Sequence, residues 1–251
     1  MEQKLRRLPV MIVTVILAVA AFFLRKSQLK TAFDEIGVIP GSGRALVWIA
    51  IAVVILFAGY SYFLRGRKKY SAISSRWLPL MGASCAAAAL LLVGSILRLG
   101  APMEKSALVI AIGGIVAAGC WVGTALSRYQ AKQAHGALFL LPAVFYVVDL
   151  VLQFRLWTRD PVILDYCFDL LALICTMCAL FHLSGYSFDQ GHRRITVFFV
   201  LCGVFFNAAA MAGAPAAEFL GYLAAALWLL VNLWLLLRPA SQREKTFEDE
   251  G

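Results

Sequence analysis

The sequence predicts an all-α, polytopic integral membrane helical bundle of about eight transmembrane helices, with both termini in the cytoplasm (N-in/C-in). Three observations lead to this prediction. The chain of 251 residues is 62% apolar and only 15% charged, whereas soluble chains are about half apolar and a quarter charged. The apolar residues fall in eight runs of 17 to 23 residues, each long enough to cross a bilayer. The basic residues are distributed unevenly between alternate loops.

Each apolar run is expected to be a helix, because lipid offers no partner for unpaired backbone N–H and C=O groups. The runs cover residues 8–24, 45–64, 77–99, 106–126, 136–157, 161–183, 195–212 and 216–237. The loops between them are too short to hold a soluble catalytic or nucleic-acid-binding domain, so residues 1–251 are expected to form a single membrane domain. The tail, 238–251, is short and mixed in charge, and is expected to be disordered in the cytoplasm.

The orientation follows from the Lys and Arg residues on each side of the membrane. Of the 23 basic residues, 15 fall in the tails and the even-numbered loops and 8 in or beside the odd-numbered loops. Cytoplasmic loops carry the excess of positive charge, so both termini are expected in the cytoplasm. The same bias explains the net charge of +9, with membrane lipids rather than nucleic acid as the expected partner. The first span is expected to stay uncleaved, because its apolar run continues beyond the small residues of 18–20.

Cysteine and glycine patterns predict packing rather than chemistry. All six cysteines fall inside predicted spans, where a thiol behaves as a small hydrophobe. Cys175 and Cys178 form a C-x-x-C without a second pair or a suitably spaced histidine, so no metal site and no cofactor are expected. The pair Gly113-Gly114 and the spacing of Gly119 and Gly123 favour close helix approach. We expect the third and fourth spans to pack together, with a homodimer face as the alternative.

The first external loop is the longest. Within residues 28–37, Leu29, Phe33 and Ile36 recur at helical spacing, which predicts a short helix lying on the membrane surface. This stretch follows a first span that ends in Phe23-Leu24-Arg25, and it resembles one in a set of uncharacterised multi-span membrane proteins of gut-type Firmicutes. The resemblance implies a bacterial cytoplasmic membrane and no particular activity.

Ionisable groups inside a bilayer are costly, so they are the first candidates for a functional site. Most of those in this chain lie at a similar depth in the outer half of the bundle, where we expect a water-accessible vestibule. Its carboxylates would bind a cation, a proton or an amine-bearing solute, unless they form structural ion pairs with the arginines. The candidate residues are Asp149, Asp165, Asp169, Tyr146, Gln153, Arg155, Arg98, Asn207 and Glu218.

Three classes of function remain open. The first, which we favour, is a protein that binds or transports a small solute or cation, alone or as the membrane subunit of a larger complex. The second is a non-catalytic sensor or scaffold that acts through an unidentified protein partner. The third is an intramembrane metal-dependent transferase.

The transferase class depends on Asp165 and Asp169, whose spacing is similar to that of the metal-binding carboxylates of the CDP-alcohol phosphotransferases. The similarity is incomplete: no glycine follows Asp149, and the interval from Asp149 to Arg155 is one residue too long. Two carboxylates from one helix also leave a divalent cation short of ligands. We therefore assign no catalytic residue and favour a protein that is not an enzyme.

Overall fold

The computed structural model describes residues 7–31, 33–34, 37–38, 44–64, 69–100, 105–130, 132–157 and 166–238. Two short 3-10 turns, η1 (Tyr70–Ile73) and η3 (Gly185–Phe188), and two two-residue strands, β1 (Phe33–Asp34) and β2 (Gly37–Val38), accompany the long helices. The long helices of this described part are α2 (Arg7–Thr31), α3 (Arg44–Tyr62), α4 (Leu78–Leu99), α5 (Lys105–Tyr129), α6 (Ala137–Trp157), α7 (Cys167–Ser184), α8 (Arg193–Ala210) and α9 (Ala216–Leu236). The predicted all-α bundle of about eight helices is confirmed.

The surface of this bundle is suited to lipid. In the part of the chain that the structure describes, seven helices are long and apolar enough to cross a membrane, and α3 contains a shorter apolar stretch, Leu46–Tyr62. Large apolar side chains such as Ile16, Ile55 and Val144 are more than half exposed on the outside of the bundle. A continuous apolar surface of this kind is unfavourable in water. The chain is therefore a multi-pass integral membrane protein.

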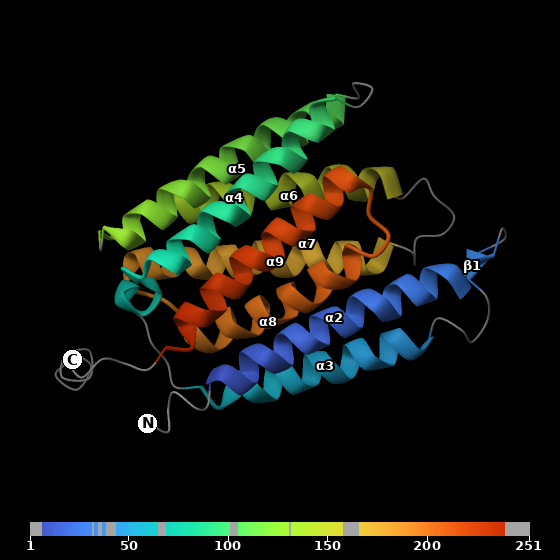
Figure 1. Cartoon of the computed structure of the whole chain (residues 1–251), viewed down its shortest axis with the longest axis horizontal. Coiled ribbons are helices and arrows are strands. Elements are labelled where there is room, and N and C mark those ends of the chain that lie inside the picture. Colours follow the sequence, from blue (N-terminus) through green and yellow to red (C-terminus); the bar gives the residue numbers. More distant parts are fainter. Residues whose placement is uncertain are drawn as a thin grey trace.

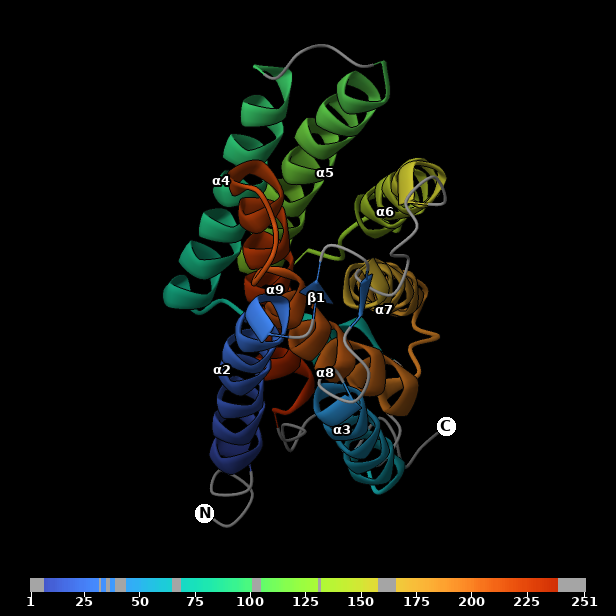
Figure 2. The same ribbon diagram turned by 90° about the vertical axis from the view of Figure 1, so that its right-hand side faces the viewer.

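The helices alternate in direction, so α2 begins and α9 ends at the same end of the bundle, on the left in Figure 1. We call this the terminal end, and the opposite end, which carries β1 and β2, the hairpin end. Helices α4 to α9 each pack against the next, and α9 packs back against α4. These six helices form a closed ring, and α2 and α3 lie outside it against α8 (Figure 2).

Helix α8 is the packing centre of the bundle. Every residue from 201 to 210 is buried, because α8 is covered by α7 and α9 within the ring and by α2 and α3 outside it. Gly203 allows α9 to approach closely: a Cβ atom there would lie 2.6 Å from Leu229 Cδ1. Close approach of this kind is a main source of helix association in lipid, where apolar burial gives little net gain.

Helix α2 differs from its prediction at the hairpin end. It continues to Thr31 instead of ending at residue 24, because the bundle accommodates Arg25, which is only 3% exposed. The Arg25 guanidinium lies 5.1 Å from the centre of the Phe168 ring, and its Nη1 donates a hydrogen bond of 2.7 Å to Gln28 Oε1. The prediction of a short surface helix over residues 28–37 is therefore wrong. Residues 28–31 belong to α2, and Phe33–Asp34 pairs with Gly37–Val38.

The expected packing of the third and fourth spans is confirmed, since α4 and α5 lie against each other. Gly114 is at this contact, where a Cβ atom would collide with Ser95 Oγ. Gly119 and Gly123 do not contribute to it, contrary to prediction. A Cβ at Gly119 would meet nothing within 4 Å, and one at Gly123 would meet Leu138 of α6.

The six cysteines lie in helices and are free thiols. Cys175 of the C-x-x-C segment adjoins Cys202 across the contact between α7 and α8. The thiols of Cys175 and Cys202 therefore fill space between α7 and α8.

Candidate functional site

The sequence candidates meet first in an ion pair at the hairpin end of the ring. Arg98 Nη1, in the last turn of α4, lies 3.7 Å from Asp149 Oδ1 of α6. The same carboxylate oxygen accepts a hydrogen bond of 2.7 Å from Gln153 Nε2, one helical turn further along α6. Asp149 and Gln153 are buried and Arg98 is partly buried. The charge of Asp149 is thus neutralised inside the bundle.

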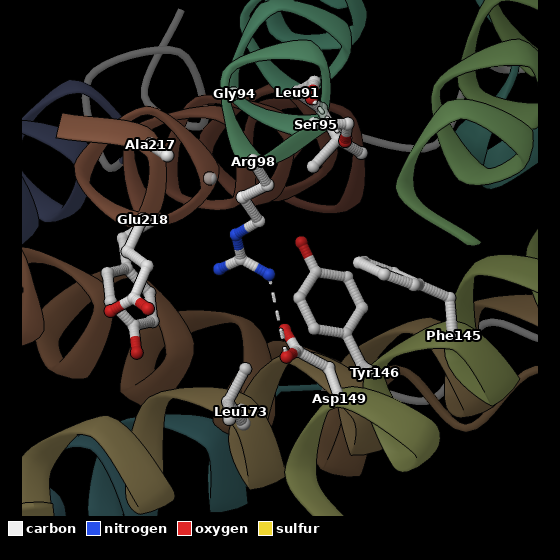
Figure 3. A pocket seen from close by; sticks show the side chains of 12 residues that line it. Leu91, Gly94, Ser95, Arg98, Phe145, Tyr146, Asp149, Leu173, Ala217 and Glu218 are labelled. Carbon is white, nitrogen blue, oxygen red and sulfur yellow. Dashed lines mark hydrogen bonds and ion pairs between the residues drawn. The ribbon is translucent and has the colours of Figure 1, made fainter. Parts of the chain in front are cut away.

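A small cavity adjoins this ion pair, and we call it the ring cavity. Its volume of about 20 Å³ is enough for one water molecule. Figure 3 shows Arg98 and Asp149 pointing toward one another across it, with Tyr146 beside them and Glu218 on the other side. The buried hydroxyl of Tyr146 has no hydrogen-bond partner among the described residues. A water in the ring cavity would satisfy it. The lining residues are Leu91, Gly94, Ser95, Arg98, Phe145, Tyr146, Asp149, Leu173, Ala217, Glu218, Gly221 and Tyr222.

A larger cavity of about 190 Å³ lies next to it, between α2, α7 and the turn from α8 to α9. We call this the lateral cavity. Its polar lining comes from Arg25 of α2, Tyr166 and Asp169 at the start of α7, and Glu218 in the first turn of α9. The remaining wall is small or apolar and is formed by Leu29, Ala210, Gly213, Ala214 and Pro215.

Glu218 lines both cavities, so charged groups form one continuous series across the hairpin end. Tyr222, one turn after Glu218 on α9, has its hydroxyl beside the Asp169 carboxylate, and Arg25 faces the same carboxylate. Glu218 in turn faces Arg98. The described residues around the two cavities contribute three carboxylates and two guanidinium groups, which leaves one net negative charge.

The structure brings Arg98, Tyr146, Asp149, Asp169 and Glu218 around these two cavities, with Gln153 held against Asp149. Two of the remaining three candidates, Asn207 and Arg155, line neither cavity. Asn207 lies between α7 and α8, where Nδ2 donates to Thr176 Oγ1 at 2.8 Å and to Gly203 O at 2.7 Å. Arg155 is exposed near the end of α6, away from both cavities. Asp165 lies outside the described residues.

Sequence reasoning missed Arg25, Tyr166 and Tyr222 of this site; Arg25 and Tyr222 show why. Arg25 was placed in a loop because the apolar run ends at residue 24. In the structure α2 continues through Arg25 to Thr31, and the Arg25 side chain contacts Phe168 of α7. Tyr222 carried a readable signal, since it follows Glu218 by four residues and therefore shares its helical face. Both line the cavities that contain the predicted acids.

The acidic and hydroxyl oxygens around the two cavities are few. Among the described residues, no three His, Cys, Asp or Glu side chains converge closely enough to hold a metal ion. Hard cations such as Ca²⁺ require six or more oxygen ligands, whereas an ammonium group is satisfied by three acceptors. Asp169, Glu218 and the Tyr222 oxygen supply acceptors on adjoining walls.

Comparison with known proteins found no relative of this chain. No family model, curated protein or solved structure matches the chain.

Proposed function

We propose that the protein binds a small amine-bearing solute in the lateral cavity and carries it across the membrane. One observation carries the proposal: two carboxylates, Asp169 and Glu218, line a cavity of about 190 Å³ at the end of an otherwise apolar bundle. Acidic side chains at membrane depth are costly and are kept where they meet water, a partner charge or a ligand. Asp149 is paired with Arg98 and lies outside the lateral cavity, so Asp169 and Glu218 are the acids of the ligand site.

The net charge of the site supports a cationic ligand. Arg25 offsets only part of the negative charge that Asp169 and Glu218 bring to the lateral cavity. A primary ammonium group would complete the charge balance and donate three hydrogen bonds. An anionic solute of the same size would add to the negative charge instead.

The position of the lateral cavity supports a conformation in which the ligand site opens toward the hairpin end. Asp169 and Glu218 lie in the first turns of α7 and α9, at the hairpin end. Deeper in the ring, Trp121 and Trp228 stack with ring centres 4.8 Å apart and are fully buried. This aromatic pair fills the bundle between the site and the terminal end. The distribution of Lys and Arg supports an orientation with the hairpin end facing away from the cytoplasm.

The test is ligand-dependent thermal stability of the purified full chain in lipid nanodiscs. The probes are methylammonium, ethanolamine and putrescine, with acetate as the anionic control. At a hundred times its Kd a ligand adds about 2.7 kcal/mol, which corresponds to about 5 to 10 °C in Tm. We expect at least one amine to produce such a shift and acetate to produce none.

The matched variants are Asp169→Asn with Glu218→Gln, which remove the acids, and Asn207→Leu, which removes a buried polar group away from the cavities. The amine-dependent shift is expected to disappear in the first variant and to persist in the second. An equal shift in the acid-free variant would exclude the lateral cavity as the amine site. No shift with any of the three amines would reject an amine-bearing solute as the ligand class.

A further inference from the structure

A second charged group is buried at the terminal end of the ring, about as far from the lateral cavity as the bundle allows. Arg128 lies in the last turn of α5 and is only 4% exposed. Its Nη2 donates a hydrogen bond of 2.6 Å to Asn232 Oδ1 of α9. The guanidinium carbon lies 5.4 Å from the centre of the Phe139 ring and 5.5 Å from that of Trp228. Aromatic rings and one neutral amide thus surround a full positive charge.

Two of the three guanidinium nitrogens of Arg128, Nε and Nη1, have no hydrogen-bond partner among the described residues. The titratable neighbour that acts on it is the hydroxyl of Tyr70, which lies close enough to interact with the guanidinium but forms no hydrogen bond of good geometry. Among the described residues, no carboxylate forms an ion pair with Arg128. Buried donors are rarely left unpaired, and a buried cation without a counter-charge is more costly still.

A cavity lies directly beside this arginine. It has a volume of about 10 Å³ and is lined by Ser75, Leu80, Met81, Ser84, Ala125, Arg128 and Leu235. The space is enough for one particle of about the size of a water molecule, so a chloride ion, which is somewhat larger, would enter with a small adjustment of the cavity walls. A lipid phosphate, with four oxygens around phosphorus, is too large for it.

The segment that covers this end of the ring is held in place from two sides. The backbone N–H of Tyr70 donates a hydrogen bond of 2.7 Å to Asp189 Oδ1, in the connection between α7 and α8. Trp77 stacks on Trp234 with ring centres 5.9 Å apart. These two contacts fix residues 69–77 over the terminal end and keep Tyr70 and Ser75 next to Arg128.

We infer that Arg128, Tyr70 and the adjoining cavity form a binding site for one small monovalent anion of the size of chloride. Water would satisfy the free donors but would leave the positive charge uncompensated, whereas a halide does both. The site is built from α5, α9 and the segment 69–77, so a bound anion would hold this segment against the ring. The inference does not depend on the proposed amine site, which lies at the other end of the bundle.

The inference is tested by ³⁵Cl NMR and thermal unfolding of the purified full chain in nanodiscs, at constant ionic strength with gluconate as the replacement anion. Bound chloride broadens the ³⁵Cl line, and we expect saturable excess broadening together with a Tm that rises with chloride. Arg128→Gln should abolish both effects. Lys132→Gln, which removes an exposed basic residue at the same end, should preserve both.

A second variant keeps the test decisive if Arg128→Gln does not fold. Tyr70→Phe removes one hydroxyl and should weaken chloride binding at least threefold while the protein remains folded. Unsaturable broadening, or chloride affinity unchanged in both Tyr70→Phe and Arg128→Gln, would overturn the inference. A further experiment changes the C-terminal acids Glu244, Glu248, Asp249 and Glu250, to test whether the acidic tail of this chain occupies the site. If chloride acts only after all four are changed to Gln or Asn, the site belongs to the tail of this chain and the inference is wrong.

Discussion

Arg98 of α4 and Asp149 of α6 form an ion pair, with Nη1 and Oδ1 3.7 Å apart, between two helices that α5 separates in the ring. This pair connects opposite walls of the ring cavity. It also divides the acids of the hairpin end into two kinds. Asp149 is neutralised by a partner, whereas Asp169 and Glu218 line the larger lateral cavity.

Removal of one partner of this pair should destabilise the protein more than removal of both. Asp149→Leu leaves Arg98 without its counter-charge, and we expect a loss of about 3 kcal/mol in the free energy of unfolding. The double variant Arg98→Met/Asp149→Leu leaves no charge unpaired and should recover most of this loss. Unfolding of the wild type, the two single variants Asp149→Leu and Arg98→Met, and the double variant in detergent provides the measurement. Additive losses in the double variant would show that the two side chains do not interact.

Asn207 should behave as a packing residue. Its amide connects α8 to Thr176 of α7, and interhelical hydrogen bonds in membranes contribute about 0.6 kcal/mol on average. We expect Asn207→Leu to lower the free energy of unfolding by about 0.6 kcal/mol and to leave amine binding unchanged. Chemical unfolding of this variant checks the free energy of unfolding, and titration with the amine that stabilises the wild type checks the affinity. A tenfold loss of affinity would place Asn207 in the ligand site.

Two glycines of α5 form a matched pair for testing the contact with α4. A methyl group at Gly114 would collide with Ser95 Oγ, so Gly114→Ala should cost about 1 to 3 kcal/mol. A methyl group at Gly119 would meet nothing within 4 Å, so Gly119→Ala should be neutral or stabilise by up to about 1 kcal/mol. Chemical unfolding of both variants decides the matter. Equal losses of stability in the two variants would contradict the arrangement in which Gly114 faces α4 and Gly119 does not.

Asp189 should be required for the arrangement of the terminal end. Its backbone has a positive φ of 54°, and its Oδ1 accepts the hydrogen bond from Tyr70 N. Asn tolerates this conformation and keeps an acceptor oxygen, whereas Ala has neither advantage. We expect Asp189→Ala to lose about 1 to 3 kcal/mol and to expose the segment 69–77 to trypsin at Lys69 and Arg76, while Asp189→Asn stays close to wild type. Equal tryptic cleavage of all three proteins would contradict this role.

Most of the fold could be predicted from the sequence because lipid leaves the backbone almost no choice. An apolar run of about 20 residues has to be a helix there, and the eight runs correspond to the eight helices. The end of α2 could not be predicted in the same way. Arg25 ends the apolar run, yet its contact with Phe168 of α7 allows the helix to continue, and such a tertiary contact leaves no mark in local hydropathy.

The depth of each candidate residue in the membrane could be predicted from the sequence, but the rotation of each helix about its own axis could not. Position along a span indicates depth, which placed Arg98, Asp149 and Glu218 together correctly. Asn207 was also placed in the outer half of its span, but its side chain points toward Thr176. The difference depends on how each helix is rotated within the ring, and rotation is set by packing contacts such as that of Gly114 with Ser95. Arg128 was missed because it was counted as a loop residue, although α5 extends beyond it.

The central claim is that Asp169 and Glu218 bind an ammonium group in the lateral cavity. The most direct measurement is isothermal titration calorimetry of the full chain in nanodiscs with the amine that stabilises it most. The account predicts one bound amine per chain, at least tenfold weaker binding in Asp169→Asn and in Glu218→Gln, and unchanged affinity in Asn207→Leu. Unchanged affinity in both acid variants would contradict it.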